Sequence, residues 1–251
     1  MAAPTAPLKK KAKTYTRNIV AYGLFTWIAF ALIGLILGPL SFLLVITGRI
    51  RITGWSNIWR AGWKNVIWVA NHPSYLDIWL PLVLLWPLAI LWPFTFVPWQ
   101  MPDKRNFKFL KNFRVFRGIA IDRGTKSSSG SMREILRALS NSVVLIFPEA
   151  GRTSSNPASR LEGLPDGVEI RIPSTGVAHI VSSTNPWIIP ILIKGSDRVL
   201  GRGQVFPRFW RQIEITIGKP YKLTISAEGQ QRKTVLQDAA NEIMTRVGTL
   251  P

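Results

Sequence analysis

A histidine and an aspartate five residues apart are the residues of this chain best placed to do chemistry. His72 and Asp77 lie in residues 71–77, which read Asn-His-Pro-Ser-Tyr-Leu-Asp. Pro73 biases His72 toward an extended conformation, so the imidazole can fold back toward Asp77. A carboxylate that holds one ring nitrogen fixes the tautomer and raises the basicity of the other nitrogen. His72 is therefore the candidate general base for an incoming hydroxyl group, and a helix-capping histidine is the alternative.

The residues around this pair predict a strand that ends in a turn. Residues 66–70 are apolar, and residues 78–80 open a second apolar run. This order predicts a buried strand, a tight turn and a short helix over about residues 76–85. Because α/β proteins place ligand sites beyond the carboxyl ends of their strands, we expect the imidazole to lie at the edge of a sheet.

Two arginines follow other apolar segments in the same way. Arg123 ends a short strand predicted within residues 118–124, and Arg152 follows a strand predicted at residues 143–147. A guanidinium group at a strand end suits a phosphate or a carboxylate, although either residue alone could equally be a surface arginine. The neighbours of Arg152 are small, and Gly151 lets backbone N–H groups approach a ligand closely. Both arginines are candidates for binding an anion in the same crevice as the imidazole.

The remaining periodic segments complete an α/β pattern. Basic and aromatic residues are interleaved over residues 103–117. Such a mixture can bind single-stranded nucleic acid, but the helical spacing of the phenylalanines favours an amphipathic helix on the sheet. Pro190 interrupts an apolar strand at residues 187–193, and because proline cannot donate to a ladder it predicts an edge strand or a bulge. We also expect strands at about residues 94–97 and 212–218 and helices at residues 127–139 and 233–247.

The overall composition is apolar and strongly basic. The chain has 251 residues, of which 47% are hydrophobic and 18% are charged, and its net charge is +19. This length suits one large domain with a full core. The positive charge indicates an anionic partner, such as nucleic acid, a membrane surface or a phosphorylated substrate. Nine of the eleven tryptophans precede residue 100, in the most apolar part of the chain, which favours a membrane interface.

The chain has no cysteine and only two histidines, which limits its chemistry. Disulfides, a thiol nucleophile and cysteine metal ligands are thereby excluded. A metal-dependent phosphodiesterase or hydrolase could use His72, Asp77 and Glu149 as ligands. Two histidines are few for such a site, however, and the nearby arginines would repel the cation. We therefore expect no metal.

The N-terminal part predicts attachment to a membrane. Residues 1–14 carry a cluster of lysines and are expected to form a basic, disordered arm that contacts anionic lipid. Residues 19–47 are uncharged and long enough to span a bilayer, but Gly38 and Pro39 would bend or break a helix there. Because basic residues stand on both sides, we favour a helical hairpin over residues 15–60 that dips into one leaflet, rather than a single span.

Four blocks in this order carry a resemblance. The chain resembles the glycerolipid acyltransferases typified by 1-acylglycerol-3-phosphate acyltransferases. That family has an Asn-His-x4-Asp block, a Gly-x-x-x-Ile-x-Arg-like block, a Phe-Pro-Glu-Gly-x-Arg-Ser-like block and a strand with a proline. Here these blocks are residues 71–77, 118–123, 147–154 and 189–190. The His-x4-Asp and Phe-Pro-Glu blocks in this order are far more specific together than either is alone.

The resemblance implies a fold and a domain division. The fold is α/β, with a mostly parallel central sheet flanked by helices and an N-terminal hydrophobic two-helix membrane-docking element. Residues 61–251 would form the acyltransferase domain. The expected place is the cytoplasmic face of a membrane, of the bacterial inner-membrane type, with membrane lipids and an anionic bilayer surface as partners and no nucleic acid.

The resemblance also implies a reaction and the residues that carry it. His72 would take the proton from a glycerol hydroxyl as that hydroxyl attacks the thioester of acyl-CoA or acyl carrier protein, with Asp77 orienting the imidazole. The transfer is direct, with no acyl-enzyme, no metal and no cofactor beyond the acyl donor. Acceptor phosphate would be held by Arg123, Gly151 and Arg152. Glu149 would partner these arginines or contact the acceptor itself. Further motif positions are Asn71, Pro73, Pro148 and Pro190.

Two departures from the family pattern concern the acceptor. Ala150 stands where the family usually has glycine. Residues 155–185 are longer than the common form, and their Arg160, Arg171 and His179 match no motif. The acceptor is therefore lysophosphatidic acid or a similar lysolipid, with another lysophospholipid or a non-phosphate lysolipid as the alternative. A non-catalytic basic protein that binds membrane surfaces is the alternative of another class.

Overall fold

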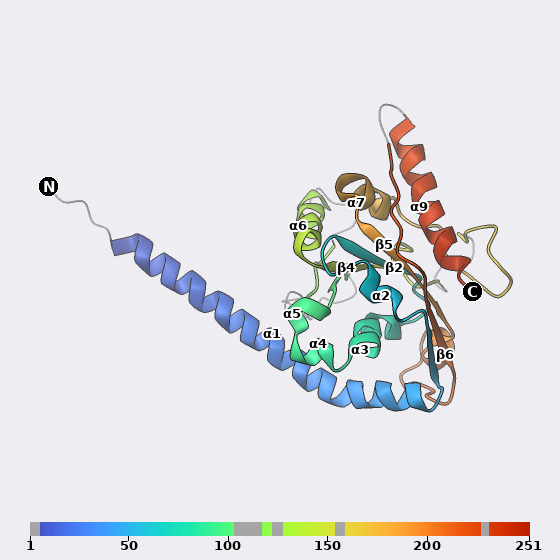
Figure 1. Cartoon of the computed structure of the whole chain (residues 1–251), viewed down its shortest axis with the longest axis horizontal. Coiled ribbons are helices and arrows are strands. Elements are labelled where there is room, and N and C mark those ends of the chain that lie inside the picture. Colours follow the sequence, from blue (N-terminus) through green and yellow to red (C-terminus); the bar gives the residue numbers. More distant parts are fainter. Residues whose placement is uncertain (1–5, 103–116, 122–127, 154–158, 227–230) are drawn as a thin grey trace.

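The chain folds around a six-stranded mixed sheet. The computed structural model describes residues 6–102, 117–121, 128–153, 159–226 and 231–251. The strand order is β1-β6-β5-β2-β4-β3, and every neighbouring pair is parallel except β5 and β6. The predicted α/β class with a mostly parallel sheet is confirmed (Figure 1). The strands are β1 (Ile50–Thr53), β2 (Val66–Ala70), β3 (Trp99–Gln100), β4 (Val143–Ile146), β5 (Trp187–Lys194) and β6 (Ile213–Ile217).

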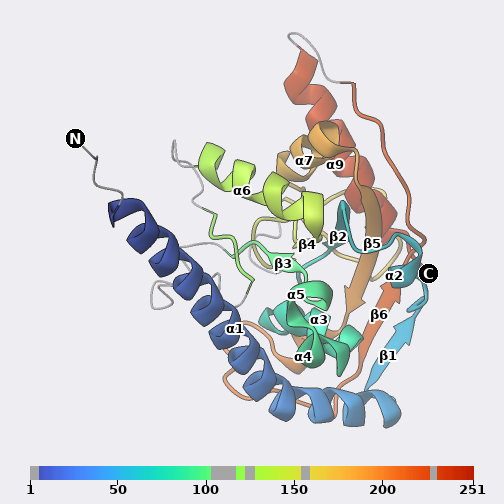
Figure 2. The same cartoon turned by 60° about the vertical axis from the view of Figure 1, so that its left-hand side comes forward.

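Helices cover both faces of this sheet (Figures 1 and 2). One face carries α6 (Ser128–Asn141), α7 (Gly176–Thr184) and α9 (Arg232–Gly248). The other carries α1 (Ala6–Ile46), α3 (Leu80–Leu85), α4 (Leu88–Leu91) and α5 (Pro93–Phe96). Short elements lie between them: α2 (Asn57–Arg60), the 3-10 helix η1 (Tyr75–Trp79) and α8 (Ser196–Val199). The helices predicted at residues 127–139 and 233–247 correspond to α6 and α9.

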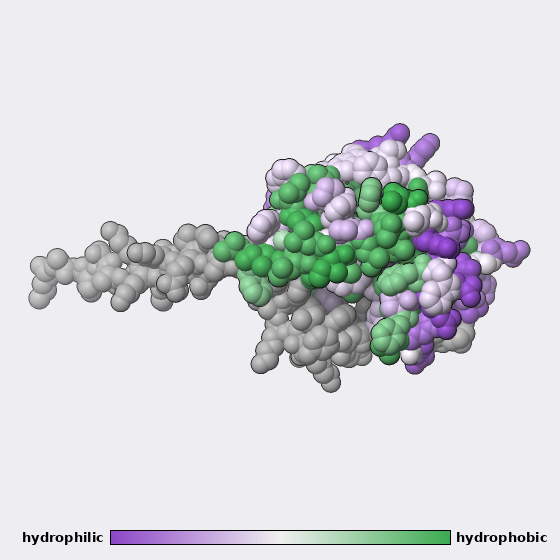
Figure 3. All heavy atoms as spheres, turned by 90° about the horizontal axis from the view of Figure 1, so that it is seen from below, coloured by the Kyte–Doolittle hydropathy of each residue, from purple (hydrophilic) through white to green (hydrophobic). Residues whose placement is uncertain are grey.

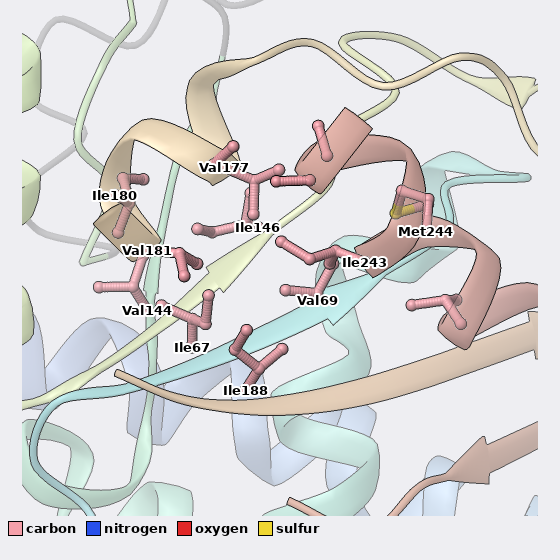
Figure 4. Close-up of a cluster of buried hydrophobic side chains, with 14 of the residues drawn as sticks. Ile67, Val69, Val144, Ile146, Val177, Ile180, Val181, Ile188, Ile243 and Met244 are labelled. Carbon is pink, nitrogen blue, oxygen red and sulfur yellow. The ribbon is translucent and has the colours of Figure 1, made fainter. Parts of the chain in front are cut away.

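The strands supply side chains to two separate cores, because successive residues of a strand point to opposite faces. Ile67 and Val69 of β2 pack under α7 and α9, whereas Val66, Trp68 and Ala70 pack on the side of α1 and α3. Figure 4 shows the first core, where side chains of β2, β4 and β5 meet those of α7 and α9. All five residues of β2 are buried, as expected for a central strand of a parallel sheet.

The N-terminal element is one helix of 41 residues, α1, so the predicted two-helix element is seen only in part. α1 begins at Ala6, within the segment expected to be a disordered arm. It bends along its length (Figure 1) and keeps Pro39 inside the helix, where the missing N–H and the ring favour a bend. Its partners are supplied by a later segment, because α1 packs against α3 and α4.

Two glycines let α1 approach these helices closely. Gly34 and Gly38 lie on the buried side of α1, and a Cβ at either position would overlap the side chain of Ile90 or of Trp86. The opposite side of α1 exposes large apolar residues. Residues Leu24–Ile46 have a mean hydropathy of 2.6 over a 23-residue stretch, enough by length and composition to cross a membrane. Figure 3 shows the resulting apolar band along α1 and its neighbours.

Pro190 lies in an interior strand, so the predicted edge strand is wrong and the predicted bulge is confirmed. β5 lies between β6 and β2. Its ladder with β6 ends at Ile191 and Ile217, and pairing resumes at Ile188 and Tyr221. Three residues therefore oppose two, which is the count of a β-bulge. The bulge spares Pro190 the hydrogen bond it cannot donate, while its carbonyl accepts from Gly218 N at 2.8 Å.

Two other local predictions are corrected. Residues 93–96 form α5 rather than a strand, because the apolar run is interrupted by prolines that begin short helices. Residues 118–121 do not form a full strand. They continue the sheet edge through single bonds such as Ile119 N to Gln100 O at 2.8 Å. The amphipathic helix predicted at residues 103–117 lies, except for its last residue, outside the described residues.

Candidate active site

Asn71 fixes the start of the turn that carries the histidine. Its side-chain Nδ2 donates to Ile193 O at 2.8 Å, and its Oδ1 accepts from Ile193 N at 2.7 Å. These two bonds imitate a backbone pair and extend the contact between β2 and β5 by one residue beyond Ala70. The next residue is therefore placed at the carboxyl edge of the sheet. Asn71 is buried, which suits a positioning role.

His72 and Asp77 meet as their spacing predicted. His72 Nδ1 lies 3.0 Å from Asp77 Oδ2, and the same oxygen accepts a 2.7 Å bond from Ser74 N. The Ser74 side chain accepts from Leu76 N at 3.2 Å, so the turn after Pro73 is closed by a cap at the start of η1. The aspartate side chain is 1% exposed and the histidine side chain 14% exposed. A buried carboxylate thus orients an imidazole that a substrate can still reach.

The imidazole also rests on the neighbouring strand end. Its ring stacks on Phe147 with the centroids 4.5 Å apart and the planes inclined by 29°. Because Asp77 accepts at Nδ1, that nitrogen carries the proton in the neutral ring, and Nε2 is left as the acceptor. This tautomer is the one a general base requires.

Glu149 ties the loop after β4 to the histidine. Its Oε1 accepts from His72 N at 2.7 Å, its Oε2 accepts from Arg171 N at 3.0 Å, and Thr153 Oγ1 donates to Oε2 at 2.8 Å. Thr153 N in turn donates to His72 O at 2.9 Å. The sequence analysis placed this carboxylate with guanidinium groups, whereas these partners are backbone groups and a hydroxyl. Glu149 therefore holds three segments together.

Burial changes the acid–base behaviour of this carboxyl group. The Glu149 residue is 1% exposed. Burial raises its pKa above the ordinary value, and the hydrogen bonds from Arg171, His72 and Thr153 oppose that rise. The net effect is a pKa above that of a free glutamate.

The loop after β4 carries the predicted anion ligands. Pro148 O accepts from Ser174 N at 2.9 Å, which connects this loop to the segment before α7. Ala150 has a φ of 58°, a left-handed conformation that favours glycine. Arg152 lies over the ring of Tyr75, with Cζ 4.1 Å from the centroid. This contact brings the guanidinium group to the turn that holds the His72–Asp77 pair, whereas Arg123 lies outside the described residues.

An apolar cavity adjoins the pair. Its volume is about 210 Å³, and Asp77 and Ser196 are polar residues in its wall. The rest of the wall comes from the second half of α1, from η1 and α3, from β1, β5 and β6, and from the loop before β6. It includes Leu37, Leu40, Leu44, Val83, Ile193 and Phe209. Within the described residues, no group of three or more His, Asp or Glu side chains could hold a metal ion.

The sequence analysis missed several residues of this site. Thr153 gave no signal apart from its place beside Arg152, and the backbone N–H of Arg171 could not be placed without the fold. Ser74 had a signal, since a serine three residues before an acidic residue indicates a helix cap. The share of α1 in the cavity was also missed, because it depends on how α1 packs rather than on its composition.

Comparisons with known proteins agree with this geometry. A family model described as acyltransferase matches residues 49–194. The crystal structure of the 1-acyl-sn-glycerophosphate (LPA) acyltransferase PlsC from Thermotoga maritima is similar, with a TM-score of 0.51 and 21% sequence identity. That match covers 96% of this chain and 84% of the other, and it shows that the two share a fold. A comparison with curated protein sequences found no match.

Proposed function

The chain belongs to the acyltransferase family of glycerolipid enzymes, and from this premise we propose that it acylates the free hydroxyl of lysophosphatidic acid or a similar lysolipid. The acyl donor is the thioester of acyl-CoA or acyl carrier protein. The observation that carries the proposal is the His72–Asp77 pair beside an apolar cavity. An acyl transfer from a thioester needs both a base for the hydroxyl and an apolar place for the chain.

His72 acts as the base. With Asp77 accepting at Nδ1, Nε2 takes the proton of the acceptor hydroxyl while its oxygen attacks the thioester carbonyl. The C–O bond forms, the tetrahedral intermediate collapses, and the C–S bond breaks. The proton then passes from Nε2 to the departing thiolate, so the enzyme returns to its starting state. No covalent acyl-enzyme forms and no metal or cofactor takes part.

The acceptor headgroup lies on the loop after β4. Arg152 supplies a permanent positive charge next to the turn of the catalytic pair, and Gly151 beside it leaves backbone N–H groups accessible. Arg123 is the second cation of the acceptor site. Glu149 contributes by holding the His72 backbone against this loop rather than by contacting the phosphate.

The cavity takes the acyl chain. Its wall is apolar except for a few residues, and Asp77 marks the end nearest the reaction. A chain whose carbonyl carbon lies at His72 can extend along α1 and α3. Burial of each methylene there contributes about 0.8 kcal/mol.

α1 keeps the enzyme at the bilayer. One side packs on the domain while the other exposes Leu35, Ile36 and Ile46, 66%, 73% and 63% exposed. Because the buried side of Leu24–Ile46 is engaged with α3 and α4, α1 lies along the membrane surface in one leaflet rather than crossing it. The site then faces the cytoplasm next to its lipid substrates.

A variant of the base tests the proposal. His72→Ala should lower kcat/KM for acyl transfer by about 10³-fold, within the range typical of a positioned general base. Purified enzyme in vesicles, with a labelled acyl donor, measures this. His179→Ala is the matched control, because the chain has only these two histidines, and it should retain activity. Equal activity in the His72→Ala variant would refute the mechanism, and its membrane association should remain unchanged.

The acceptor is identified separately. A panel of lysolipids with and without a phosphate group, followed by mass analysis of the product, gives its class. Arg152→Ala should raise the KM for a phosphorylated acceptor and leave that of the acyl donor unchanged. Arg137→Ala, an exposed arginine on α6, is the control. An unchanged acceptor KM in Arg152→Ala would remove this residue from the acceptor site.

A further inference from the structure

The loop between α8 and β6 exposes its apolar residues instead of burying them. Val205 and Phe206 at its tip are 80% and 83% exposed, and Trp210 is 63% exposed. They are the two most exposed large apolar side chains that the structure describes. Large apolar residues gathered on one projecting loop are unusual for a surface in contact with water alone.

The loop is a held structure rather than a loose connection. Arg208 N donates to Val199 O at 2.8 Å, which closes the base of the tip, and Arg211 N donates to Arg208 O at 2.9 Å. Arg49, which follows α1, donates from Nη1 to Trp210 O at 2.7 Å. Its apolar tip is therefore presented in a fixed position beside the end of α1.

The loop and α1 form one continuous surface. Pro207 and Phe209 line the cavity from one side, and Leu40 and Leu44 of α1 line it from another. Outside the cavity, α1 exposes Phe42, Leu43 and Ile46 near its end. The tip of the loop thus extends the apolar surface of α1 across the mouth of the site.

The charge of the loop selects one kind of partner. Four arginines, and no acidic residue, lie between residues 198 and 213. They are Arg198, Arg202, Arg208 and Arg211. Apolar side chains at a tip with arginines around them match a bilayer, where the apolar groups reach the acyl region and the guanidinium groups reach lipid phosphates.

We propose that this loop is a second membrane anchor, which inserts Val205, Phe206 and Trp210 into the leaflet that holds α1. The arginines pair with the phosphates of anionic lipids. The inference rests on the proposed function for the membrane position of α1. Together α1 and the loop place the cavity between two inserted elements, so an acyl chain can enter it from the lipid without crossing water. A protein partner would fit the apolar tip but would not explain its continuity with α1.

A depth measurement tests the insertion. The chain has no cysteine, so Val205→Cys can carry a single environment-sensitive fluorophore. In vesicles of phosphatidylglycerol that contain nitroxide-labelled lipid, we expect a blue-shifted emission and strong quenching of this label. Ser183→Cys on α7, also exposed, is the control and should show neither. Ile36→Cys reports α1 in the same vesicles.

Each outcome has one meaning. Quenching at positions 36 and 205 but not 183 supports the second anchor. Quenching at position 36 alone overturns the proposed loop insertion and leaves the proposed function in place. Quenching at neither position overturns the membrane position of α1 and the inference with it. Acyl transfer by the same labelled proteins is measured separately, so a failed anchor is distinguished from a failed enzyme.

The arginines are tested with lipid composition. Replacing phosphatidylglycerol with phosphatidylcholine should weaken insertion of the label at position 205. In the Arg202→Gln/Arg208→Gln variant this dependence should fall, by roughly fivefold for each arginine removed. Arg232→Gln at the start of α9, far from α1 in Figure 1, is the charge-matched control. A dependence that stays unchanged in the double variant would overturn the proposed role of the arginines.

Discussion

One face of the sheet is sealed by helices that turn polar residues to water, whereas the other is covered by helices that are apolar on both sides. Under α7 and α9, core residues such as Ile180 and Ile243 are completely buried. On the other face, α1 buries one side on α3 and α4 and exposes Ile36 to the extent of 73%. The first face is complete in the protein alone. The second, which holds the cavity, is completed by lipid.

The largest expected effect is a difference between these faces for the same substitution. Ile243→Ala should lower the free energy of unfolding by about 2–5 kcal/mol, because it leaves a cavity in a closed core. Ile36→Ala, on the exposed side of α1, should change it by less than about 0.5 kcal/mol. Urea unfolding of the full chain in a mild detergent measures both. Equal losses would mean that the outer side of α1 is packed against protein, and the comparison would fail.

The second prediction concerns how each face tolerates an added methyl group. Gly38→Ala should destabilise the packing of α1 by about 1–3 kcal/mol, because its Cβ would overlap Trp86. Gly130→Ala in α6 is the matched control. Nothing lies within 4 Å of a Cβ there, so the change should stabilise the helix by about 0.5–1 kcal/mol. Thermal unfolding of both variants gives the signs, and a stable Gly38→Ala would show that α1 is not held at this contact.

Local signals explain which parts of the site could be predicted. The fold-back of His72 onto Asp77 depends on Pro73 and on the Ser74 cap, all within six residues, so the sequence carried it. The partners of Glu149 lie 77 and 22 residues away, at His72 and Arg171. No local pattern could supply them.

The same reasoning covers the fold. Strands β2, β4, β5 and β6 had clear apolar patterns, and all four were predicted. The position of Pro190 inside the sheet depends on an extra residue opposite it near Gly218, which is visible only in the pairing. A bent α1 in place of a hairpin also depends on distant contacts, since Gly34 and Gly38 allow α3 and α4 to pack against one side of it.

The third prediction concerns the polar edge, where the two faces end and neither core covers the chain. Ala150 adopts a left-handed conformation, which costs an alanine about 1–2 kcal/mol. Ala150→Gly should therefore stabilise the protein, by about 0.5–1 kcal/mol after the greater freedom of glycine in the unfolded chain is included. Thermal unfolding measures this. A lower midpoint in Ala150→Gly would show that the Ala150 side chain makes a compensating contact.

The smallest effect is the pH dependence of the same edge. Burial raises the pKa of Glu149 in the folded protein above its value of 4.5 in a free chain. Between these two values the folded state binds more protons than the unfolded state, so stability falls as pH rises through this window and is regained as pH is lowered toward 4.5. Glu149→Gln lacks this contribution. The stability difference between wild type and this variant should therefore increase on acidification from neutral pH, as urea midpoints would record.

A control for charge completes this test. Glu162→Gln removes an exposed carboxylate from the same chain. Comparing it with Glu149→Gln separates the effect of burial from the loss of one negative charge. If the difference between wild type and Glu149→Gln shrinks on acidification, the carboxylate is stabilised in its charged form by the backbone groups of His72 and Arg171. The edge would then resemble an anion-binding loop already occupied by its own glutamate, rather than a buried group held against its preference.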